Sequence, residues 1–454
     1  MLQLIYLASA AAFIIGLRQL GSPRTARSGN AIAGSGMLVA VVATLIQQDI
    51  LNWAAIGIAA AVGAAVGAIW ARQVAMTAMP QMVAALNGFG GAASALVAGA
   101  ELTARDPGLA RFDVQVTLLA ALAIGAVTLS GSAVAFGKLQ GIVSGKALVY
   151  TGQAAVSVVV TLVIIGAGVA ALLTGEVLPF WIVAAVALVI GVLMVLPVGG
   201  ADMPVVVSML NSFSGLAAAG TGFAIENSAL IIGGALVGSA GFILTVQMCE
   251  AMNRSLLNVL LGAFRPPAVM AAADTGDQAV RSATQEDVAI ALAYAQRVMI
   301  VPGYGLAVAQ AQHNVQTLAR ELEERGVEVT YAIHPVAGRM PGHMNVLLAE
   351  ADVDYEKLID MDEANQMASL IDVVLVLGAN DVVNPAARDD ATSSIYGMPI
   401  IEVDRAKTVV VVKRSMSPGY AGIDNPLFYA EGTMMFFGDA KEAVQRITES
   451  LAMV

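Results

Sequence analysis

Nine long apolar stretches dominate the first part of the chain. Each is about 17 to 25 residues long, which is the length that an α-helix needs to cross a hydrocarbon core of roughly 30 Å. We expect nine transmembrane helices, at about residues 2–20, 28–48, 52–71, 80–102, 113–136, 153–174, 179–198, 204–223 and 228–248. The first stretch lacks a basic segment before it and is followed by arginines, so we interpret it as a retained helix rather than a signal peptide.

A different pattern begins near residue 286, where short apolar runs alternate with amphipathic segments. Strands are predicted at RVMIVPG, VEVTYAIHP, DVVLVLGANDVVNP, PIIEV and TVVVVKRS, and a helix at AQHNVQTLARELEERG, which ends on Gly326. Such alternation predicts a Rossmann-like, doubly wound parallel sheet. We therefore expect a polytopic α-helical membrane domain over residues 1–264, a linker rich in Ala, Asp, Thr and Gln over 265–285, and a soluble α/β domain over 286–454.

Composition and charge agree with this division. The chain is 58% hydrophobic and 13% charged, against averages of roughly 45–50% and 25% for soluble domains. Residues 1–265 hold 10 of the 23 Lys and Arg and 8 of the 34 Asp and Glu, so their net charge is +2 and that of the remainder is −13. An acidic soluble part argues against nucleic-acid binding. The single cysteine, Cys249, can form no intrachain disulfide.

The basic residues indicate which helix ends face the cytoplasm. If the soluble domain is cytoplasmic, the outside loops hold only Arg105 and Arg111. The inside loops then hold eight basic residues, namely Arg18, Arg24, Arg27, Arg72, Lys138, Lys146, Arg254 and Arg265. Because cytoplasmic loops are enriched in Lys and Arg, this distribution favours a cytoplasmic soluble domain.

The membrane part contains an internal repeat. Residues 79–93 read MPQMVAALNGFGGAA and residues 203–217 read MPVVVSMLNSFSGLA, and each is followed by a helix with a related fragment, LSGSA or LVGSA. Because both pairs would run in the same direction, we predict a parallel structural repeat of the fourth and fifth helices with the eighth and ninth. The alternative is chance agreement between helices rich in Ala and Gly.

Polar residues inside these apolar stretches suggest a pathway. The repeat puts Asn87 and Asn211 at matching places, roughly 10 Å from a cytoplasmic-side proline, and Ser132 lies at a similar depth. Polar side chains within a bilayer usually face a bundle interior or a wet cavity, although they can also join helices by hydrogen bonds. Asp202, at the cytoplasmic mouth, could exchange protons or could cap a helix.

A Gly303, Gly305, Val308 spacing follows the first predicted strand of the soluble part. A G-x-G turn between strand and helix lets backbone N–H groups meet a pyrophosphate, the alternative being an unliganded tight turn. NAD-selective sites carry an acidic residue after the second strand, whereas here that strand ends in His334 and Pro335. Lys413 and Arg414 could instead hold a 2′-phosphate, or could be solvated surface charge.

Eleven strings across nearly the whole chain resemble one family. They are MTAMP, SGSAVAFGK, GGADMPVVVSMLNSFSG, CEAMNRS, VPGYGLAVAQAQ, IHPVAGRMPGHMNVLLAEA, MDEAN, GANDVVNPAA, KRSM, PGYAGIDNPLF and FFGDAK. They resemble the beta subunit of the bacterial proton-translocating NAD(P) transhydrogenases. The resemblance implies a membrane domain and an NADP(H)-binding domain on this chain, with NAD(H) bound by a partner alpha subunit.

The resemblance also implies roles for particular residues. Gly303, Tyr304, Gly305, Ala307 and Val308 would lie along the pyrophosphate. Val336, Ala337, Gly338, Arg339 and Met340 would hold the phosphates, with Tyr355 near the nucleotide. Gly378, Ala379, Asn380, Asp381 and Asn384 would approach the nicotinamide side. Lys413 and Arg414 would bind the 2′-phosphate, and Gly419, Tyr420 and Ala421 would belong to a loop that covers NADP(H).

In the membrane, the resemblance assigns proton translocation to Ser132, Asp202 and Asn211. Asn87 departs from the family, many of whose members carry a histidine there, and asparagine cannot titrate. All three histidines lie in the soluble part, so the membrane part has no side chain that titrates near neutral pH. We therefore expect a partner membrane helix to supply the proton-binding histidine.

The enzyme implied is a Re/Si-specific proton-translocating transhydrogenase that moves protons inward and needs its alpha subunit. We expect no catalytic side chain and no metal on this chain, because hydride transfer between nicotinamides needs mainly proximity and exclusion of water. The expected setting is a multi-pass protein in the lipid of the bacterial inner membrane, within a dimer of the alpha/beta assembly.

Two other classes of function fit parts of the pattern. An ion channel or transporter with a nucleotide-sensing domain would carry a selectivity filter or strongly charged midmembrane residues, and neither is visible in the sequence. A nucleotide-binding scaffold that anchors a partner would leave the paired asparagines and the repeat unexplained.

Overall fold

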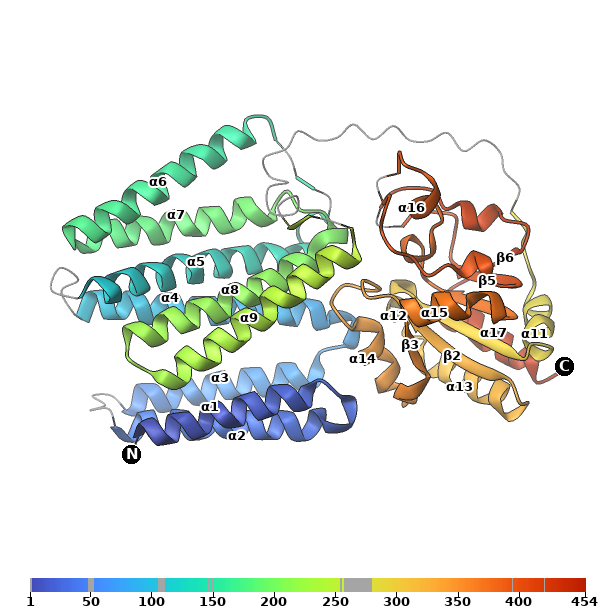
Figure 1. Cartoon of the computed structure of the whole chain (residues 1–454), viewed down its shortest axis with the longest axis horizontal. Helices are drawn as coiled ribbons and strands as arrows, with labels where there is room; N and C mark the ends of the chain where they lie inside the picture. The colour runs from blue at the N-terminus through green and yellow to red at the C-terminus, as the bar shows by residue number, and fades with distance from the viewer. Residues whose placement is uncertain are drawn as a thin grey trace. The chain divides into compact units, whose positions relative to one another are not determined.

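The computed structural model describes residues 2–47, 53–104, 111–145, 147–148, 150–253, 255–256, 280–393, 395–419 and 421–454. The chain forms two compact units (Figure 1). Met1–Gly199 and Val205–Thr245 belong to a helical unit, and the sheet lies in the other.

The helical unit confirms the predicted membrane domain. Nine helices among the described residues are long and apolar enough to cross a membrane. They are α1 (Leu2–Leu20), α2 (Pro23–Gln47), α3 (Trp53–Gln73), α4 (Met79–Ala104), α5 (Phe112–Gln140), α6 (Gln153–Thr174), α7 (Val177–Val195), α8 (Met203–Ala224) and α9 (Ser228–Ala251). The largest difference is at α2, which begins five residues before its predicted start, at Pro23. Proline suits that position because its fixed φ is helical and its missing N–H would be unpaired there.

The loop assignment of several basic residues is wrong. Arg18, Arg24, Arg27, Arg72 and Lys138 lie within helices, not in loops. A helix can continue past its apolar stretch, because long basic side chains near a helix end reach the membrane interface. Arg105, Lys146, Arg254 and Arg265 lie outside the described residues. The cytoplasmic placement of these ends stays a prediction.

Glycines allow the membrane helices to approach closely. A Cβ on Gly91 of α4 would lie 2.7 Å from the carbonyl oxygen of Gly125 in α5, and one on Gly215 of α8 would lie 2.3 Å from the amide nitrogen of Gly238 in α9. Gly91 and Gly215 occupy matching places in the repeated segments. The α4–α5 and α8–α9 crossings therefore use the same repeat position on α4 and α8, which supports the predicted parallel repeat.

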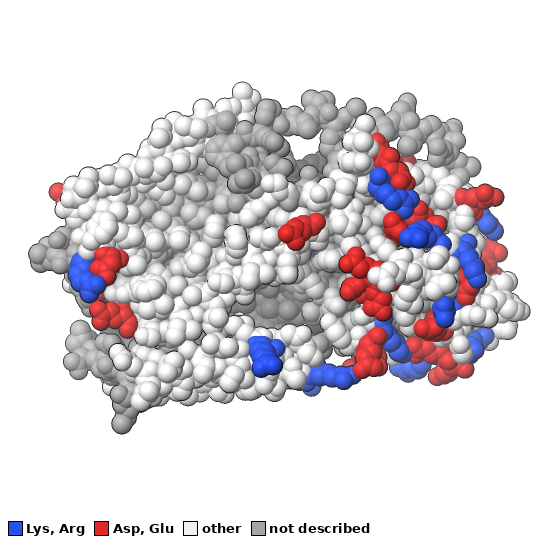
Figure 2. Space-filling model, in the orientation of Figure 1, with Lys and Arg blue, Asp and Glu red and all other residues white. Residues whose placement is uncertain are grey.

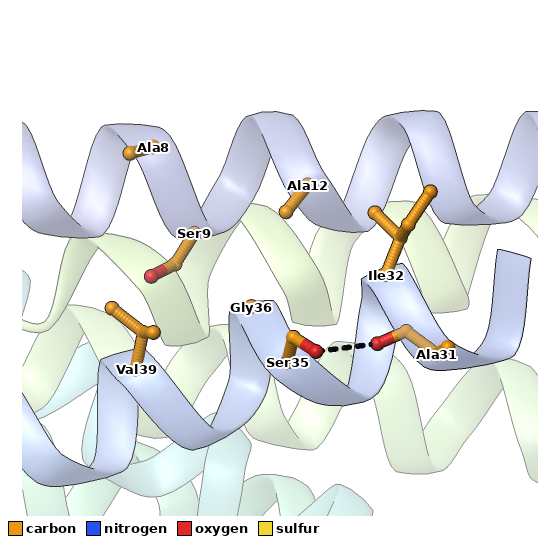
Figure 3. Close-up of a pocket in the computed structure, with 8 residues that line it drawn as sticks. All are labelled: Ala8, Ser9, Ala12, Ala31, Ile32, Ser35, Gly36 and Val39. Carbon is orange, nitrogen blue, oxygen red and sulfur yellow. Dashed lines mark hydrogen bonds between the residues drawn. The ribbon is translucent and has the colours of Figure 1, made fainter. Parts of the chain in front are cut away.

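The first three helices present mostly apolar surface. α3 has no buried residue. Between α1 and α2 lies a groove of about 390 Å³, apolar apart from the hydroxyls of Ser9 and Ser35 (Figure 3). Charged side chains gather over the sheet instead, while the helical unit is almost free of them on the visible face (Figure 2). This contrast is the one that separates a lipid-facing bundle from a soluble domain.

The second unit is built on a six-stranded parallel sheet in the order β3-β2-β1-β4-β5-β6. The strands are β1 (Arg297–Pro302), β2 (Glu328–Ile333), β3 (Leu358–Asp360), β4 (Val373–Leu377), β5 (Thr408–Lys413) and β6 (Thr433–Phe437). This order confirms the predicted Rossmann-like doubly wound fold.

Helices cover both faces of the sheet. The mutually packed helices α11 (Gln285–Ala293), α12 (Tyr304–Ala309), α13 (Gln312–Glu324), α14 (His343–Glu350) and α17 (Ala440–Leu451) lie on one face. On the other, α15 (Met361–Met367) and the turns η8 (Val403–Arg405) and η9 (Pro426–Tyr429) bury a core with Met299, Val301, Val374 and Val411. Short helices η5 (Tyr355–Lys357), η6 (Ala368–Leu370), η7 (Asp381–Val383) and α16 (Ala386–Asp389) complete the unit.

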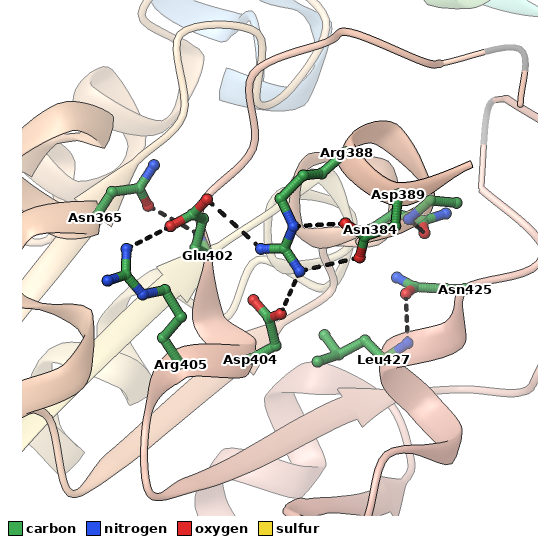
Figure 4. Close-up of polar contacts among 10 residues, drawn as sticks. Asn365, Asn384, Arg388, Asp389, Glu402, Asp404, Arg405, Asn425 and Leu427 are labelled. Carbon is green, nitrogen blue, oxygen red and sulfur yellow. Dashed lines mark hydrogen bonds and ion pairs between the residues drawn. The ribbon is translucent and has the colours of Figure 1, made fainter. Parts of the chain in front are cut away.

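The predicted strand at PIIEV is wrong. Residues 399–402 are irregular although Ile400 and Ile401 are buried. The Asn365 side chain bonds part of this backbone in place of a strand, because its Nδ2 donates to Ile400 O at 2.9 Å. Glu402 N donates to Asn365 Oδ1 at 2.8 Å (Figure 4). Arg388 of α16 adds ion pairs to Asp404 at 2.7 Å and to Glu402 at 3.5 Å. The sheet takes its remaining strands from β3 and β6, which the sequence pattern did not single out.

The amino-terminal edge of the sheet is fastened by Asp372. Its Oδ2 accepts hydrogen bonds from the N–H groups of Gln296 and Arg297, and its Oδ1 accepts one from Lys407 at 2.7 Å. These bonds, the one from Lys407 first, lower the pKa of Asp372 to about 2. The end of the predicted linker joins the edge strand β6, where Ser282 pairs with Met435. Residues 257–279, most of that linker, lie outside the described residues.

Candidate functional site

The predicted nucleotide residues gather where β1 and β4 lie side by side. The chain leaves β1 toward β2 and leaves β4 toward β5 on the other side, so the loops after these strands diverge. In doubly wound sheets this switch point, at the carboxyl ends of the strands, is where ligands bind. The segments directly after β1, β2 and β4, and the end of β5 with the loop after it, carry all but one of the candidate residues in this unit.

The floor of this crevice is made by backbone against backbone. Gly303 N donates to Leu377 O at 2.9 Å, and Gly305 N donates to Gly378 O at 2.9 Å. A Cβ on Gly303 would lie 2.4 Å from Ala379 Cα, and Gly378 has a φ of +64°. The glycines of the G-x-G turn are therefore required by the close approach of the β4 loop, which fixes the path of the turn.

The short helix α12 begins at this turn. Its Ala307 is fully buried, whereas Val308 is 44% exposed. A valine fits at the place where related motifs have Gly or Ala because its side chain points away from the sheet. Tyr304 faces the loop after β2, where the Arg339 guanidinium carbon lies 4.3 Å from the centre of its ring. This cation–π contact joins two of the segments expected to hold phosphates.

His334 fixes the loop that follows β2. Its ring is 2% exposed. Val336 N donates to His334 Nδ1 at 3.2 Å, so Nε2 carries the proton and donates to Pro399 O at 2.8 Å. Burial lowers the pKa of His334 to about 4. This neutral ring stands where an NAD-selective site would have a carboxylate.

We expect His334 to make the loop sensitive to acid. Its folded pKa of about 4 lies below the ordinary value of about 6.5, so the stability it contributes is complete above pH 6.5 and is lost as the pH falls toward 4. The loss reaches about 3 kcal/mol at the acid end. In urea unfolding of the purified protein between pH 7.5 and 4, the His334→Gln variant should show a weaker pH dependence than the unmodified protein. Parallel curves for the two proteins would contradict this role.

The turns of the β2 loop set the positions of its other residues. Ala337 is buried, and Gly338 has a φ of +106°. A Cβ on Gly338 would lie 2.5 Å from the His343 ring, whose Nδ1 accepts a hydrogen bond from Arg339 N at 3.1 Å. Met340 O accepts from His343 N at 3.2 Å. His343 therefore orients the backbone that presents Arg339.

The loop after β4 is joined to a segment that we call the cover loop, residues 417–423. Asp381 Oδ2 accepts a hydrogen bond from Ala421 N at 3.0 Å. A Cβ on Gly419 would lie 2.5 Å from Asp381 Oδ1 and 2.8 Å from Asn380 Nδ2. The cover loop thus lies against the β4 loop at the expected nicotinamide side. Tyr420 lies outside the described residues.

Two buried asparagines join the β4 loop to the residues that directly follow the cover loop. Asn425 Nδ2 donates to Asn380 O and Asn380 Oδ1, both at 3.1 Å, while its Oδ1 accepts from Leu427 N. Asn384 Nδ2 donates to Asp424 O at 3.0 Å and its Oδ1 accepts from Ala386 N. Asn384 therefore supports the loops with both ends of its amide. The sequence did not reveal the role of Asn425, because only the fold brings it to Asn380.

The two basic residues at the end of β5, Lys413 and Arg414, differ in their contacts. Lys413 Nζ donates to Ser417 O of the cover loop and lies 4.9 Å from the centre of the Phe428 ring. Burial lowers the pKa of Lys413, and the nearby carboxylates of Asp381 and Asp424 oppose this change. Arg414 is exposed. Lys413 thus holds the cover loop, while Arg414 is accessible to a ligand anion.

Tyr355 is the candidate that the fold does not bring to the crevice. It lies in η5, before β3 begins, and is 48% exposed. Two residues later, Lys357 pairs with Glu323 at the end of α13. Because α13 ends just before β2 begins, this pair lies on the amino-terminal side of the sheet. The geometry therefore separates Tyr355 from the other nucleotide candidates.

In the helical unit, three of the predicted pathway residues lie close together. Asn87 is 7% exposed and its Nδ2 donates to Val207 O of α8 at 3.1 Å. Val207 and Asn211 are four residues apart and so lie on adjacent turns of one helix face. A Cβ on the neighbouring Gly88 would lie 3.1 Å from Ser132 Cβ of α5. We call this meeting point of α4, α5 and α8 the polar seam.

The seam is a polar strip in an apolar bundle. Ser132 is 1% exposed and its Oγ has no hydrogen-bond partner among the described residues. Toward the other end of the helices, Thr221 of α8 donates to Ser94 O of α4 at 3.4 Å. Asp202 ends the short helix η3 (Gly200–Asp202), directly before α8. A buried hydroxyl beside two amides can hold water, which a proton pathway needs.

The known proteins to which this chain is similar share one description. The family model described as NAD(P) transhydrogenase beta subunit matches residues 2–450. Two sequences of NAD(P) transhydrogenase subunit beta from Rhodospirillum rubrum are each 47% identical over 454 residues, covering 98% of this chain and 98% of the relative.

Proposed function

Since the chain belongs to the family of NAD(P) transhydrogenase beta subunits, we propose that it binds NADP(H) in the crevice of its sheet and carries most of a proton path in its helices. As a member of that family it is a subunit of an enzyme that couples hydride transfer between NADH and NADP⁺ to proton translocation across a membrane. In this proposal the transfer is Re/Si-specific, and reduction of NADP⁺ accompanies inward proton movement.

One arrangement supports NADP(H) rather than NAD(H) on this chain. The G-x-G turn is fastened to the β4 loop at the switch point, an exposed Arg414 follows β5, and neutral His334 follows β2. A 2′-hydroxyl would meet no carboxylate after β2, whereas a 2′-phosphate would meet a guanidinium. Calorimetric titration of the purified chain should show binding of NADP⁺ and much weaker binding of NAD⁺. Equal affinities would overturn the assignment.

Arg414→Ala is expected to weaken NADP⁺ binding about 10- to 100-fold and to leave NAD⁺ binding unchanged. A hydrogen bond to a charged group contributes about 1.5–3 kcal/mol, and 1.4 kcal/mol is a factor of ten. Arg320→Ala, on an exposed side of α13, serves as the matched control because it removes the same charge elsewhere. If both variants lose affinity equally, Arg414 acts only through net charge.

This chain orients one nucleotide, and the alpha subunit would orient the other. Bound NADP⁺ would accept the hydride from NADH on the alpha subunit, and in the reverse reaction bound NADPH would supply it. The β1, β2 and β4 loops would hold its phosphates and ribose, and the cover loop would exclude water from the nicotinamide. Gly303 and Gly305 bring the turn against the β4 loop, and the backbone N–H groups of such a turn between strand and helix would meet a pyrophosphate. No side chain is needed as a nucleophile or metal ligand.

The proton gradient would set the direction of the reaction. The two nicotinamide couples are nearly equal in potential, and one charge crossing 100 mV is worth about 2.3 kcal/mol. At 1.4 kcal/mol per decade this shifts the product ratio roughly 40-fold. Coupling requires that protonation change NADP(H) affinity or the position of the cover loop, and the linkage must act in both directions.

The partner would complete the proton path. Asn87 holds a matching place in the repeat and reaches α8, but an amide has no titrating proton. We propose that a membrane helix of the alpha side supplies a histidine near the polar seam. A partner membrane chain without an intramembrane histidine or carboxylate would contradict this. The proposed setting is the bacterial inner membrane, with the sheet domain (286–454) in the cytoplasm, the membrane domain over 1–264, and two alpha/beta assemblies forming a dimer.

A further inference from the structure

Lys138 is a buried cation that the proposed proton path does not use. It lies in the last turn of α5 and is only 5% exposed. Its Nζ donates to Leu196 O at 2.5 Å and to Val198 O at 2.7 Å. Burying an ammonium is costly unless it is well hydrogen-bonded. The two carbonyl acceptors meet that condition, and an apolar residue at this position could not donate to them.

The two carbonyl groups belong to the turn that connects α7 with α8. Leu196 is the residue that ends α7, and the carbonyl groups at a helix end carry its partial negative charge. Leu148 N also donates to Leu196 O, at 3.3 Å. The ammonium therefore fixes the end of α7 by charge as well as by hydrogen bonding.

This turn leads directly into the polar seam. Val198 precedes Asp202 by four residues, and α8 begins at the next residue, Met203. On the other side of the contact, Ser132 lies six residues before Lys138 on α5, or roughly 9 Å along the helix. Lys138 thus joins the helix that carries Ser132 to the start of the helix that carries Asn211.

We propose that Lys138 is a positioning residue of the proton path, which holds the α7–α8 turn against α5 so that α8 keeps its register with Ser132 and Asn87. The proposal rests on the proposed function of the polar seam. Register matters because Asn87 reaches a single carbonyl of α8, at Val207. A shift of α8 by one residue, about 1.5 Å, would break that bond and separate the polar groups.

The test uses the complete complex with its alpha partner in sealed vesicles, and measures protons moved per hydride transferred. Lys138→Met should lower this ratio at least fivefold, while hydride transfer in detergent falls less than twofold. Lys138→Arg, which keeps the charge and the donors, should retain at least half of the ratio. A loss of both activities in proportion, with the ratio unchanged, would show that Lys138 only stabilises the fold and would overturn the proposal.

Gln81→Leu is the matched control. Gln81 of α4 is also buried and its Nε2 donates to Leu139 O at 3.2 Å, beside Lys138. This variant removes a neutral bond at the same end of the bundle and leaves the α7–α8 turn in place, so the proton ratio should stay normal. An equal loss in Gln81→Leu would contradict a specific role for Lys138. An unmodified complex that moves no protons would contradict the proposed function itself.

Discussion

Replacing Gly303 with alanine is expected to abolish NADP(H) binding. The new Cβ would lie 2.4 Å from both Ala379 Cα and Gly378 O. These are backbone atoms of the β4 loop and cannot turn aside as a side chain can. The loop must shift, which breaks the bonds of Gly303 N to Leu377 O and of Gly305 N to Gly378 O. We expect the Kd for NADP⁺ to rise at least 100-fold and the free energy of unfolding to fall by about 1–3 kcal/mol.

Gly432→Ala is the control for this variant. A Cβ there would meet only Lys407 O, at 3.7 Å, which is ordinary contact. Calorimetric titration with NADP⁺ and urea unfolding should therefore give normal values for Gly432→Ala. Normal NADP⁺ affinity in Gly303→Ala would mean that the nucleotide does not bind over this turn.

Asn87→Leu is expected to lower the protons moved per hydride at least tenfold in vesicles that contain the whole complex. Leucine is of similar size but cannot donate to Val207 O, and it makes the polar seam apolar beside Ser132. A pathway for protons needs a continuous series of polar groups or waters. NADP⁺ should still bind, because the crevice in the sheet contains none of these atoms.

Phe89→Leu provides the comparison on the same helix. Phe89 lies two residues from Asn87 in α4 but is 63% exposed, so its replacement alters the outer surface of the helix and not the seam. The proton ratio should stay normal in this variant. If Asn87→Leu also moves protons normally, Asn87 serves only to join α4 and α8.

The features visible in the sequence are those set by local physical chemistry. Nine apolar stretches predicted nine helices because each membrane crossing must satisfy its own backbone. The G-x-G turn was recognisable because Gly303 and Gly305 stand between a strand and a helix. The five-residue run PIIEV was misleading, since short apolar runs do not distinguish a strand from buried irregular chain, and here Asn365 bonds the backbone instead.

Other features depend on contacts between residues far apart in the chain. Lys138 looked like a loop charge until the fold placed Leu196 and Val198 around its ammonium. Asn425 and His334 support the crevice through Asn380 and Pro399, which no spacing rule connects to them. Tyr355 was assigned by resemblance alone, and its position before β3 separates it from the crevice. Motifs therefore indicated the candidate site, while its supporting contacts required the structure.

The coupling of hydride transfer to proton movement is tested most directly with the complex reconstituted in sealed vesicles. Hydride transfer from NADPH to an NAD analogue is followed by absorbance while a trapped dye records the internal pH. The internal pH is expected to change in step with hydride transfer, and both are expected to depend on the alpha subunit. Hydride transfer at full rate with no change in internal pH would contradict this coupling.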